Sequence, residues 1–165
     1  MTERSAKQAS TQVSKIIRAP RKAVYQACLD PDAVALWRAP TNMKGHVHDF
    51  DAREGGTFRM SLTYRDPARS PGGKTSDHTD TFKGRFVELV PDGKIVEAIE
   101  FESPDPRFSG EMKIVTTFTD SAGDTKVTIL CQDIPAGIRL DDNEMGCRSS
   151  LENLAALVEQ SDKQI

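Results

Sequence analysis

The 165-residue sequence has few cysteines, no long apolar segment and no excess of positive charge, and each of these features excludes a class of protein. Its three cysteines, Cys28, Cys131 and Cys147, are widely spaced, odd in number and not arranged in a CxxC motif. A disulfide framework is therefore not expected. The thiols are interpreted as reduced and mostly buried, as is usual in the cytosol.

The apolar segments and the charge balance narrow the class further. No apolar segment approaches the ~20 residues that a membrane-spanning helix needs, and the polar N-terminal residues lack the apolar centre of a secretory signal. The net charge of −3 does not favour binding to nucleic acid or to a membrane surface. We therefore expect a cytoplasmic protein without a membrane span and without a nucleic-acid partner.

Alternating apolar residues and turn signals predict seven strands, with helices only near the two ends of the chain. A first strand is predicted over 12–18, followed by two short helices, one beginning at Pro20 and one capped by Asp30. An amphipathic helix is predicted over 142–160. The six other strands are predicted over 44–51, 57–64 and 79–90 and, beyond a turn at 91–93, around 95–101, 112–118 and 127–131.

This order predicts an α+β fold, in which a curled antiparallel sheet of about seven strands must cover its apolar face. The long C-terminal helix is the expected cover, and a curled sheet around a helix leaves space between the two. Residues 1–11 contain almost nothing to bury and are predicted to form a flexible tail. A single domain is then expected over 12–161.

Eight short pieces of sequence, in order and at matching spacings, point to a known family. They are AP (19–20) with VYQA (24–27), DP (30–31), LWRAP (36–40), DAREGGTF (51–58), GRFVE (84–88), PDGKIV (91–96), VTTF (115–118), and GCR (146–148) with Leu151 and Leu154. Over about residues 12–160 the chain resembles the activator of heat-shock protein 90 ATPase homologue family. That family belongs to the START-like (SRPBCC, birch-pollen-allergen-like) superfamily.

The resemblance implies a helix-grip fold that holds a small apolar or amphipathic ligand between the sheet and the last helix. Two positions depart from the family pattern. Arg38 stands where the second of two adjacent aromatic residues is usual, and Cys147 stands where tryptophan is usual. If a cysteine replaces an indole that lines the pocket, roughly 100 Å³ of side chain or more is missing. Either the neighbours have repacked, or the cavity is larger than usual.

The residues expected to line this cavity lie on the inward positions of the strands, on the second short helix and on the apolar stripe of the last helix. The alternative for each of them is that it only fills the core. The set is Trp37, Phe58, Met60, Leu62, Phe82, Phe86, Ile99, Phe101, Met112, Ile114, Cys147, Leu151 and Leu154.

Four polar residues are candidates for catalysis in the same space. Glu97 shares a strand face with apolar residues, and a carboxylate in an apolar cavity is a candidate catalytic group. Glu88 has a similar but weaker case. His78 and Asp80 alternate on one strand face, where they could form a general-base pair. The alternative for all four is a solvated or structural role.

The remaining candidates have plain structural interpretations. His46 and His48 point the same way from one strand and could bind zinc together with His78, but solvated surface histidines are favoured. Cys147 lies near the start of a helix, where a thiol can be activated, but its place in the apolar stripe favours inert packing. The loop 66–77 is interpreted as either a lid or a hairpin tip. No metal and no cofactor are expected.

Three functions remain open at this point. The first is the binding of a small hydrophobic molecule without catalysis. The second is a cyclase, dehydratase or hydrolase acting on a polyketide-like substrate in the cavity. The third is a module associated with heat-shock protein 90. ATPase activation is not expected, because no N-terminal domain precedes Gln12. The exposed edges of the predicted sheet are compatible with a homodimer.

Overall fold

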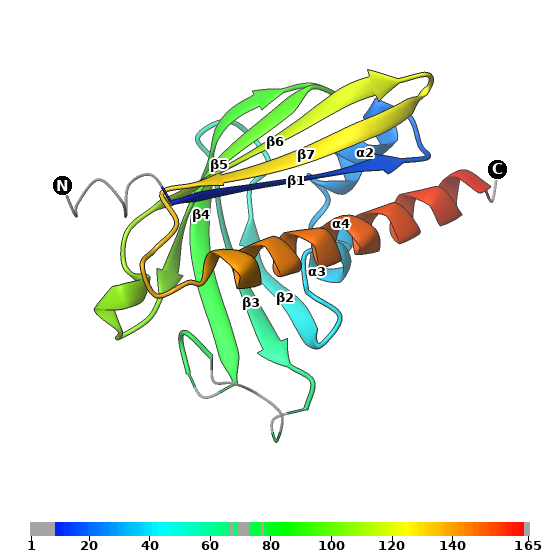
Figure 1. Ribbon diagram of the computed structural model, residues 1–165. Helices are drawn as coiled ribbons and strands as arrows, with labels where there is room; N and C mark the ends of the chain where they lie inside the picture. The colour runs from blue at the N-terminus through cyan, green and yellow to red at the C-terminus, as the bar shows by residue number, and fades with distance from the viewer. Residues whose placement is uncertain (1–8, 67, 69–72, 77, 164–165) are drawn as a thin grey trace.

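The fold is that of a computed structural model, which describes residues 9–66, 68, 73–76 and 78–163. Seven strands form one antiparallel sheet in the order β1-β7-β6-β5-β4-β3-β2, and the long helix α4 runs along its curled inner side (Figure 1). The predicted α+β helix-grip architecture is confirmed. The elements are β1 (Ser10–Ile17), α2 (Arg21–Ala27), α3 (Pro31–Trp37), β2 (Met43–Phe50), β3 (Thr57–Tyr64), β4 (Thr79–Val90), β5 (Lys94–Glu102), the 3-10 turn η2 (Pro106–Phe108), β6 (Met112–Ser121), β7 (Asp124–Gln132) and α4 (Leu140–Lys163).

The sheet is built from consecutive antiparallel neighbours between β2 and β7, and β1 completes it by pairing with β7. The turn between β4 and β5 places Asp92 at φ 61°, as a tight hairpin requires. The register shifts between Val47 and Asp49 and between Phe86 and Glu88. Irregularities of this kind increase the local twist, so the sheet curls around the helix rather than lying flat.

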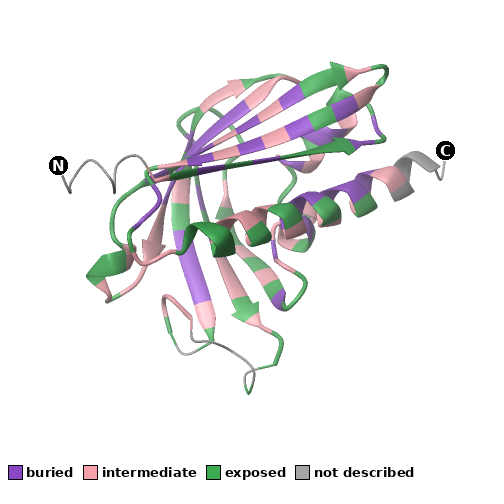
Figure 2. Ribbon diagram, viewed as in Figure 1, coloured by how far each residue is buried: buried purple, intermediate pink, exposed green. Residues whose placement is uncertain are grey.

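The helix α4 packs against the sheet with one face only. Leu151, Leu154, Ala155 and Val158 are buried on that face, whereas the opposite face is exposed (Figure 2). The helix begins two residues before its predicted start at 142. Because its middle is seated on the core, a hollow between α4 and the sheet is expected beside its first turns.

The N-terminal boundary of the sheet differs from the prediction. The first strand begins at Ser10 rather than at 12, Thr11 is buried, and the carbonyl oxygen of Ala9 accepts a hydrogen bond from the backbone N–H of Ile134. Residues 9–11 of the predicted tail are therefore part of the packed structure, because β7 and the residues just after it offer them hydrogen-bonding partners. The rest of that tail, residues 1–8, lies outside the described residues.

Two other predictions bear on the ends of elements. Pro20 caps α2 instead of beginning it, whereas Asp30 caps α3 as predicted and accepts a hydrogen bond from the backbone N–H of Asp32.

Within the part of the chain that the structure describes, no helix has the length and hydropathy needed to cross a membrane. Part of the loop predicted at 66–77, including the tip on which the lid interpretation depends, lies outside the described residues.

Gly84 on β4 is expected to be required for the packing of the sheet face. A Cβ at this position would lie 2.5 Å from Cζ of Phe58 and 2.9 Å from the carbonyl oxygen of Ala98. The substitution Gly84→Ala should therefore lower the free energy of unfolding, measured in urea, by about 1–3 kcal/mol. The matched control is Gly146→Ala in α4, where a Cβ meets nothing within 4 Å. It should raise stability by about 0.5–1 kcal/mol, and a change of the same sign in both variants would contradict the packing.

Candidate functional site

A hollow of about 880 Å³ lies between the inner face of the sheet and the first turns of α4. It lies within the range of about 300–1,000 Å³ that is typical of small-molecule sites. Strands β3 to β7 supply its floor, and the segment after α3 and the start of α4 supply its sides. The apolar side chains that line it are Trp37, Met43, Leu62, Phe82, Ile99, Phe101, Phe108, Met112, Ile114, Ile129, Ile138 and Met145.

The structure divides the thirteen residues expected to line the hollow into two groups. Eight of them contribute to its wall: Trp37, Leu62, Phe82, Ile99, Phe101, Met112, Ile114 and Cys147. The other five belong to the buried core and do not line the hollow: Phe58, Met60, Phe86, Leu151 and Leu154.

An ion pair between Arg38 and Glu97 is buried in the wall of this hollow. Nη1 of Arg38 donates to Oε1 of Glu97 at 2.7 Å, and only 15% and 7% of the two side chains are exposed. Arg38 caps the C-terminal end of α3, and its carbonyl oxygen accepts a hydrogen bond from the Ser150 hydroxyl of α4. Trp37 beside it donates its indole N–H to the carbonyl oxygen of Ala27. The backbone that carries Arg38 is thus held from two sides.

The surroundings of Arg38 keep it charged. Burial acts to lower the pKa of Arg38, but the charge of Glu97 and the hydrogen bond to it outweigh burial, so the pKa lies above its ordinary value. The guanidinium carbon also lies 5.8 Å from the ring centre of Phe58 and 5.4 Å from that of Phe82. Both distances are within the range of cation–π attraction. A fixed cation therefore lies in an otherwise apolar wall.

A second ion pair stands at another part of the wall. Asp80 on β4 is buried, and its two carboxylate oxygens accept hydrogen bonds from the backbone N–H of Lys74 at 2.6 Å and from its Nζ at 3.0 Å. Nζ of Lys74 lies 5.0 Å from the ring centre of Phe101 and 5.8 Å from that of Phe108. The predicted pairing of Asp80 with His78 is not what the structure shows, because the carboxylate is held by Lys74 and His78 is exposed.

The other predicted polar candidates lie away from the hollow. Glu88 is paired with Lys94 at 3.0 Å, and both side chains are substantially exposed. His46 and His48 are exposed on the outer side of the sheet, with their ring centres 4.6 Å apart, and His48 shares a hydrogen bond with Ser61. Among the described residues, no group of three or more His, Cys, Asp or Glu side chains is placed to hold a metal ion.

Two of the three thiols meet at the wall of the hollow. Sγ of Cys131 on β7 lies 3.8 Å from Sγ of Cys147 on α4. The pKa of Cys131 is lowered, first by the hydrogen bond with Cys147, which outweighs burial, and then by hydrogen bonds with Thr11 and Asn143 and by the charge of Arg38. The hydrogen bond with Cys131 and burial raise the pKa of Cys147.

Sequence reasoning missed the partners of the two buried carboxylates. Arg38 was noted only as a departure from an aromatic pattern, although a lone cation beside Trp37 and a lone carboxylate on the apolar face of β5 are a recognisable pair of signals. Lys74 gave no signal, because it lies in a loop rich in glycine and polar residues. The meeting of Cys131 and Cys147 depends on how α4 lies on the sheet.

Comparisons with known proteins agree with this architecture. The sequence model of the family described as Activator of Hsp90 ATPase homolog 1-like protein matches residues 18–159. Protein CV1439 from Chromobacterium violaceum has a solved structure that is 31% identical in sequence, with a TM-score of 0.80, and the match covers 91% of this chain and 96% of that chain. The AHSA1-like protein from Aeromonas hydrophila is 18% identical, with a TM-score of 0.68 and coverage of 93% and 94%, which supports the fold alone. No curated protein matches the sequence.

Proposed function

Because the chain belongs to the family of proteins like Activator of Hsp90 ATPase homolog 1, whose START-like fold commonly binds ligands, we propose that it binds a small amphipathic molecule between the sheet and α4. One observation carries the proposal. A hollow of about 880 Å³ has a mostly apolar wall that includes a fixed, charged pair, Arg38 and Glu97. Apolar walls with a few well-placed polar groups are characteristic of ligand sites.

The charges in the wall define the kind of ligand. Three cationic side chains, Arg38, Lys74 and Arg139, are balanced by three anionic ones, Asp80, Glu97 and Asp142. The hollow therefore has no excess charge to attract a polyanion such as a nucleotide. A guanidinium group has five N–H donors, and the bond to Glu97 uses only part of them. We expect an uncharged or weakly polar molecule that presents a carbonyl or hydroxyl oxygen to Arg38.

The expected affinity is modest. A ligand of about 20 non-hydrogen atoms that gains about 0.3 kcal/mol per atom has a binding free energy of about 6 kcal/mol. This corresponds to a Kd in the tens of micromolar. Such a ligand dissociates during purification, so the protein has to be tested with added compounds.

A thermal-shift panel tests the proposal directly. Fatty acids, flavonoids, polyketides and steroids should be compared, and at 100 times Kd a true ligand stabilises the protein by about 2.7 kcal/mol. For a chain of this length, that corresponds to a rise in Tm of several degrees. Calorimetry should then show one saturable site per chain. If no class shifts Tm, and amide NMR signals of the residues lining the hollow do not move, the proposal is wrong.

Catalysis on a polyketide-like substrate is the second candidate, favoured by one observation: two carboxylates, Glu97 and Asp80, line the hollow. Each is already hydrogen-bonded to a cation of the protein, so neither is poised as a free base, and binding without turnover is preferred. The two candidates differ in a direct assay. Product formation from a ligand found in the panel, lost in Glu97→Gln but not in Glu88→Gln, would establish the enzyme.

A further inference from the structure

A pair of thiols in the wall of the hollow has no role in the proposed function. Cys131 lies on β7 and Cys147 on α4, and the distance between their Sγ atoms is 3.8 Å. Sγ of Cys147 also lies 3.9 Å from Oδ1 of Asn143, an oxygen that in turn accepts a hydrogen bond from the Thr11 hydroxyl. The two sulfur atoms thus face one another at the boundary between the sheet and its covering helix.

We propose that Cys131 and Cys147 form a redox-active dithiol, which a hydroperoxide entering the hollow converts into a disulfide between β7 and α4. A disulfide requires the sulfur atoms to approach to about 2.05 Å. From their separation of 3.8 Å, the two Sγ atoms therefore have to move about 1.7 Å closer together. Cys147 is itself only partly buried, so its side chain is not held by dense packing.

The charges near the pair favour its reaction. The thiolate is the reactive form of cysteine, and a nearby cation stabilises it. Arg38 provides that cation, since its charge contributes to lowering the pKa of Cys131. The contact between the two Sγ atoms lets one thiol donate a hydrogen bond to the sulfur of the other, so the pair loses its first proton more readily than an isolated buried thiol. Cys28 is the contrast, because burial raises its pKa and it lies outside the wall.

The reaction is balanced without any further reagent. One thiolate of the pair attacks the terminal oxygen of the hydroperoxide, the O–O bond breaks, and the alcohol leaves after taking a proton. The other thiol then gives up its proton and attacks the resulting sulfenic acid, the S–O bond breaks and water leaves. The two thiols supply two electrons, and the hydroperoxide is reduced to an alcohol and water.

The wall of the hollow selects among hydroperoxides. Phe82, Ile99, Met112 and Ile114 lie on the same wall as the thiols and offer apolar contact. Hydrogen peroxide gains nothing from such contact, whereas a hydroperoxide that carries an apolar group does. An organic hydroperoxide should therefore oxidise the pair in preference to hydrogen peroxide. This inference requires access to the hollow, but it does not require the proposed ligand.

The test is oxidation of the wild-type chain by one equivalent of cumene hydroperoxide. Titratable thiols should fall from three to one per chain, and one molecule of cumyl alcohol should form for each chain oxidised. Trypsin separates Cys131, in peptide 127–139, from Cys147, in peptide 140–148, so the disulfide should link these two peptides within one monomer. Dithiothreitol should restore all three thiols. No linked peptide, a link through Cys28, or a link between two chains would overturn the proposal.

Two variants and a second oxidant complete the design. Cys147→Ser should form no intramolecular disulfide, whereas Cys28→Ser should form it as the wild type does. The rate with cumene hydroperoxide, divided by the rate with hydrogen peroxide, should exceed the same ratio for free cysteine. A ratio equal to or below that of free cysteine would overturn the role of the hollow. The wild-type peptide map does not depend on the folding of either variant, so the disulfide itself remains testable if one of them misfolds.

Discussion

The substitution Arg38→Ala is expected to lower the free energy of unfolding by about 3–5 kcal/mol, because it leaves the Glu97 carboxylate buried without its cation. The carboxylate of Glu97 is 7% exposed and receives the Nη1 hydrogen bond at 2.7 Å, so water cannot easily replace the guanidinium. Urea denaturation at neutral pH measures the effect. A loss below about 1 kcal/mol would mean that water reaches Glu97 freely and that the pair is not buried in solution.

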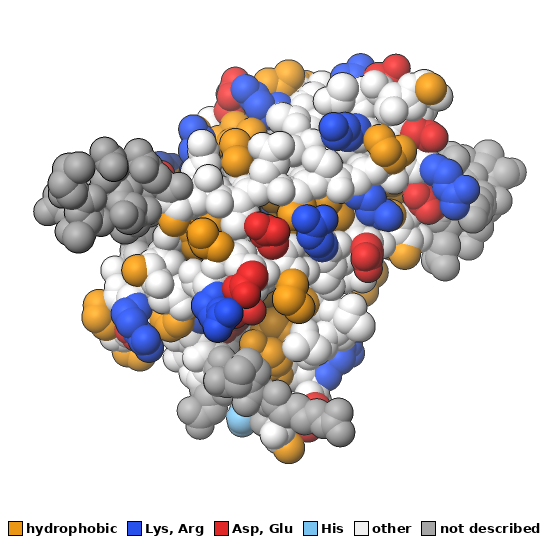
Figure 3. All heavy atoms as spheres, in the orientation of Figure 1, with side chains coloured by type: hydrophobic (Ala, Val, Ile, Leu, Met, Phe, Trp, Pro, Cys, Tyr) orange, Lys and Arg blue, Asp and Glu red, His pale blue; other side chains and the backbone are white. Residues whose placement is uncertain are grey.

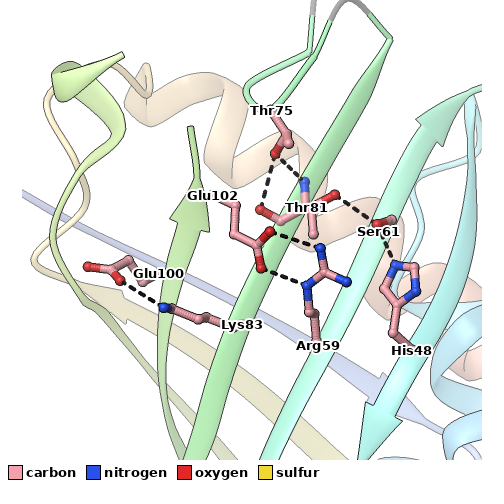
Figure 4. A network of polar contacts seen from close by, with 8 residues as sticks. All are labelled: His48, Arg59, Ser61, Thr75, Thr81, Lys83, Glu100 and Glu102. Carbon is pink, nitrogen blue, oxygen red and sulfur yellow. Dashed lines mark hydrogen bonds and ion pairs between the residues drawn. The ribbon is translucent and has the colours of Figure 1, made fainter. Parts of the chain in front are cut away.

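A matched control lies on the opposite face of the same sheet. Arg59 donates to both carboxylate oxygens of Glu102, at 2.7 and 2.9 Å, in a polar network that runs across the outer face (Figure 4). The two side chains are 44% and 31% exposed. Arg59→Ala should therefore cost less than about 1 kcal/mol, although the geometry of the pair is better than that of Arg38 and Glu97. The contrast between the two variants would show that burial is the cause of the larger loss of stability in Arg38→Ala.

A double variant separates the two roles of the buried pair. Replacing a buried ion pair by apolar residues of similar size is often neutral for stability, so Arg38→Met with Glu97→Leu should recover most of the loss. The fold therefore does not need the pair. We expect the double variant to be stable and yet to lose the ligand, because its wall has no donor for a ligand oxygen. If the double variant recovers binding as well as stability, Arg38 is not the donor to the ligand that the proposed function requires.

The strands were predictable because their signal is local. The predicted bounds 57–64 and 79–90 are those of β3 and β4, since alternation of apolar residues depends only on the pleat of each strand. The long helix could be predicted for the same reason, from the stripe of apolar residues along one of its faces.

On the face that carries α4, acidic and basic side chains are interspersed, in keeping with the small net charge (Figure 3).

The cavity wall could not be separated from the core by such signals. Phe58 and Leu62 point to the same side of β3, but Phe58 is packed against Phe86, with ring centres 5.0 Å apart, and Leu62 lines the hollow. Likewise, Leu151 is in the core, whereas Cys147, one turn earlier on α4, lines the hollow. The difference depends on where the helix crosses the sheet, and no local pattern carries that information.

Cys147→Trp is expected to weaken binding of any ligand found in the panel about tenfold, a loss of about 1.4 kcal/mol. The resemblance to the family places tryptophan at this position, and an indole is about 100 Å³ larger than the cysteine side chain, so it should occupy that much of the hollow. Because an empty cavity lowers stability and the indole would fill it, the free energy of unfolding should rise by about 1–2 kcal/mol. Calorimetric titration and urea denaturation measure the two effects on the same samples.

The opposite signs of the two effects make this prediction specific. Glu152→Trp is the control, because Glu152 lies on the exposed side of α4 and an indole there enters solvent instead of the hollow. It should leave both affinity and stability within about 0.5 kcal/mol of the wild type. A loss of about 1–3 kcal/mol of stability in Cys147→Trp would mean that the neighbours of Cys147 have already closed the gap. In that case the side chain is packed, and the hollow beside α4 is too small for the proposed ligand.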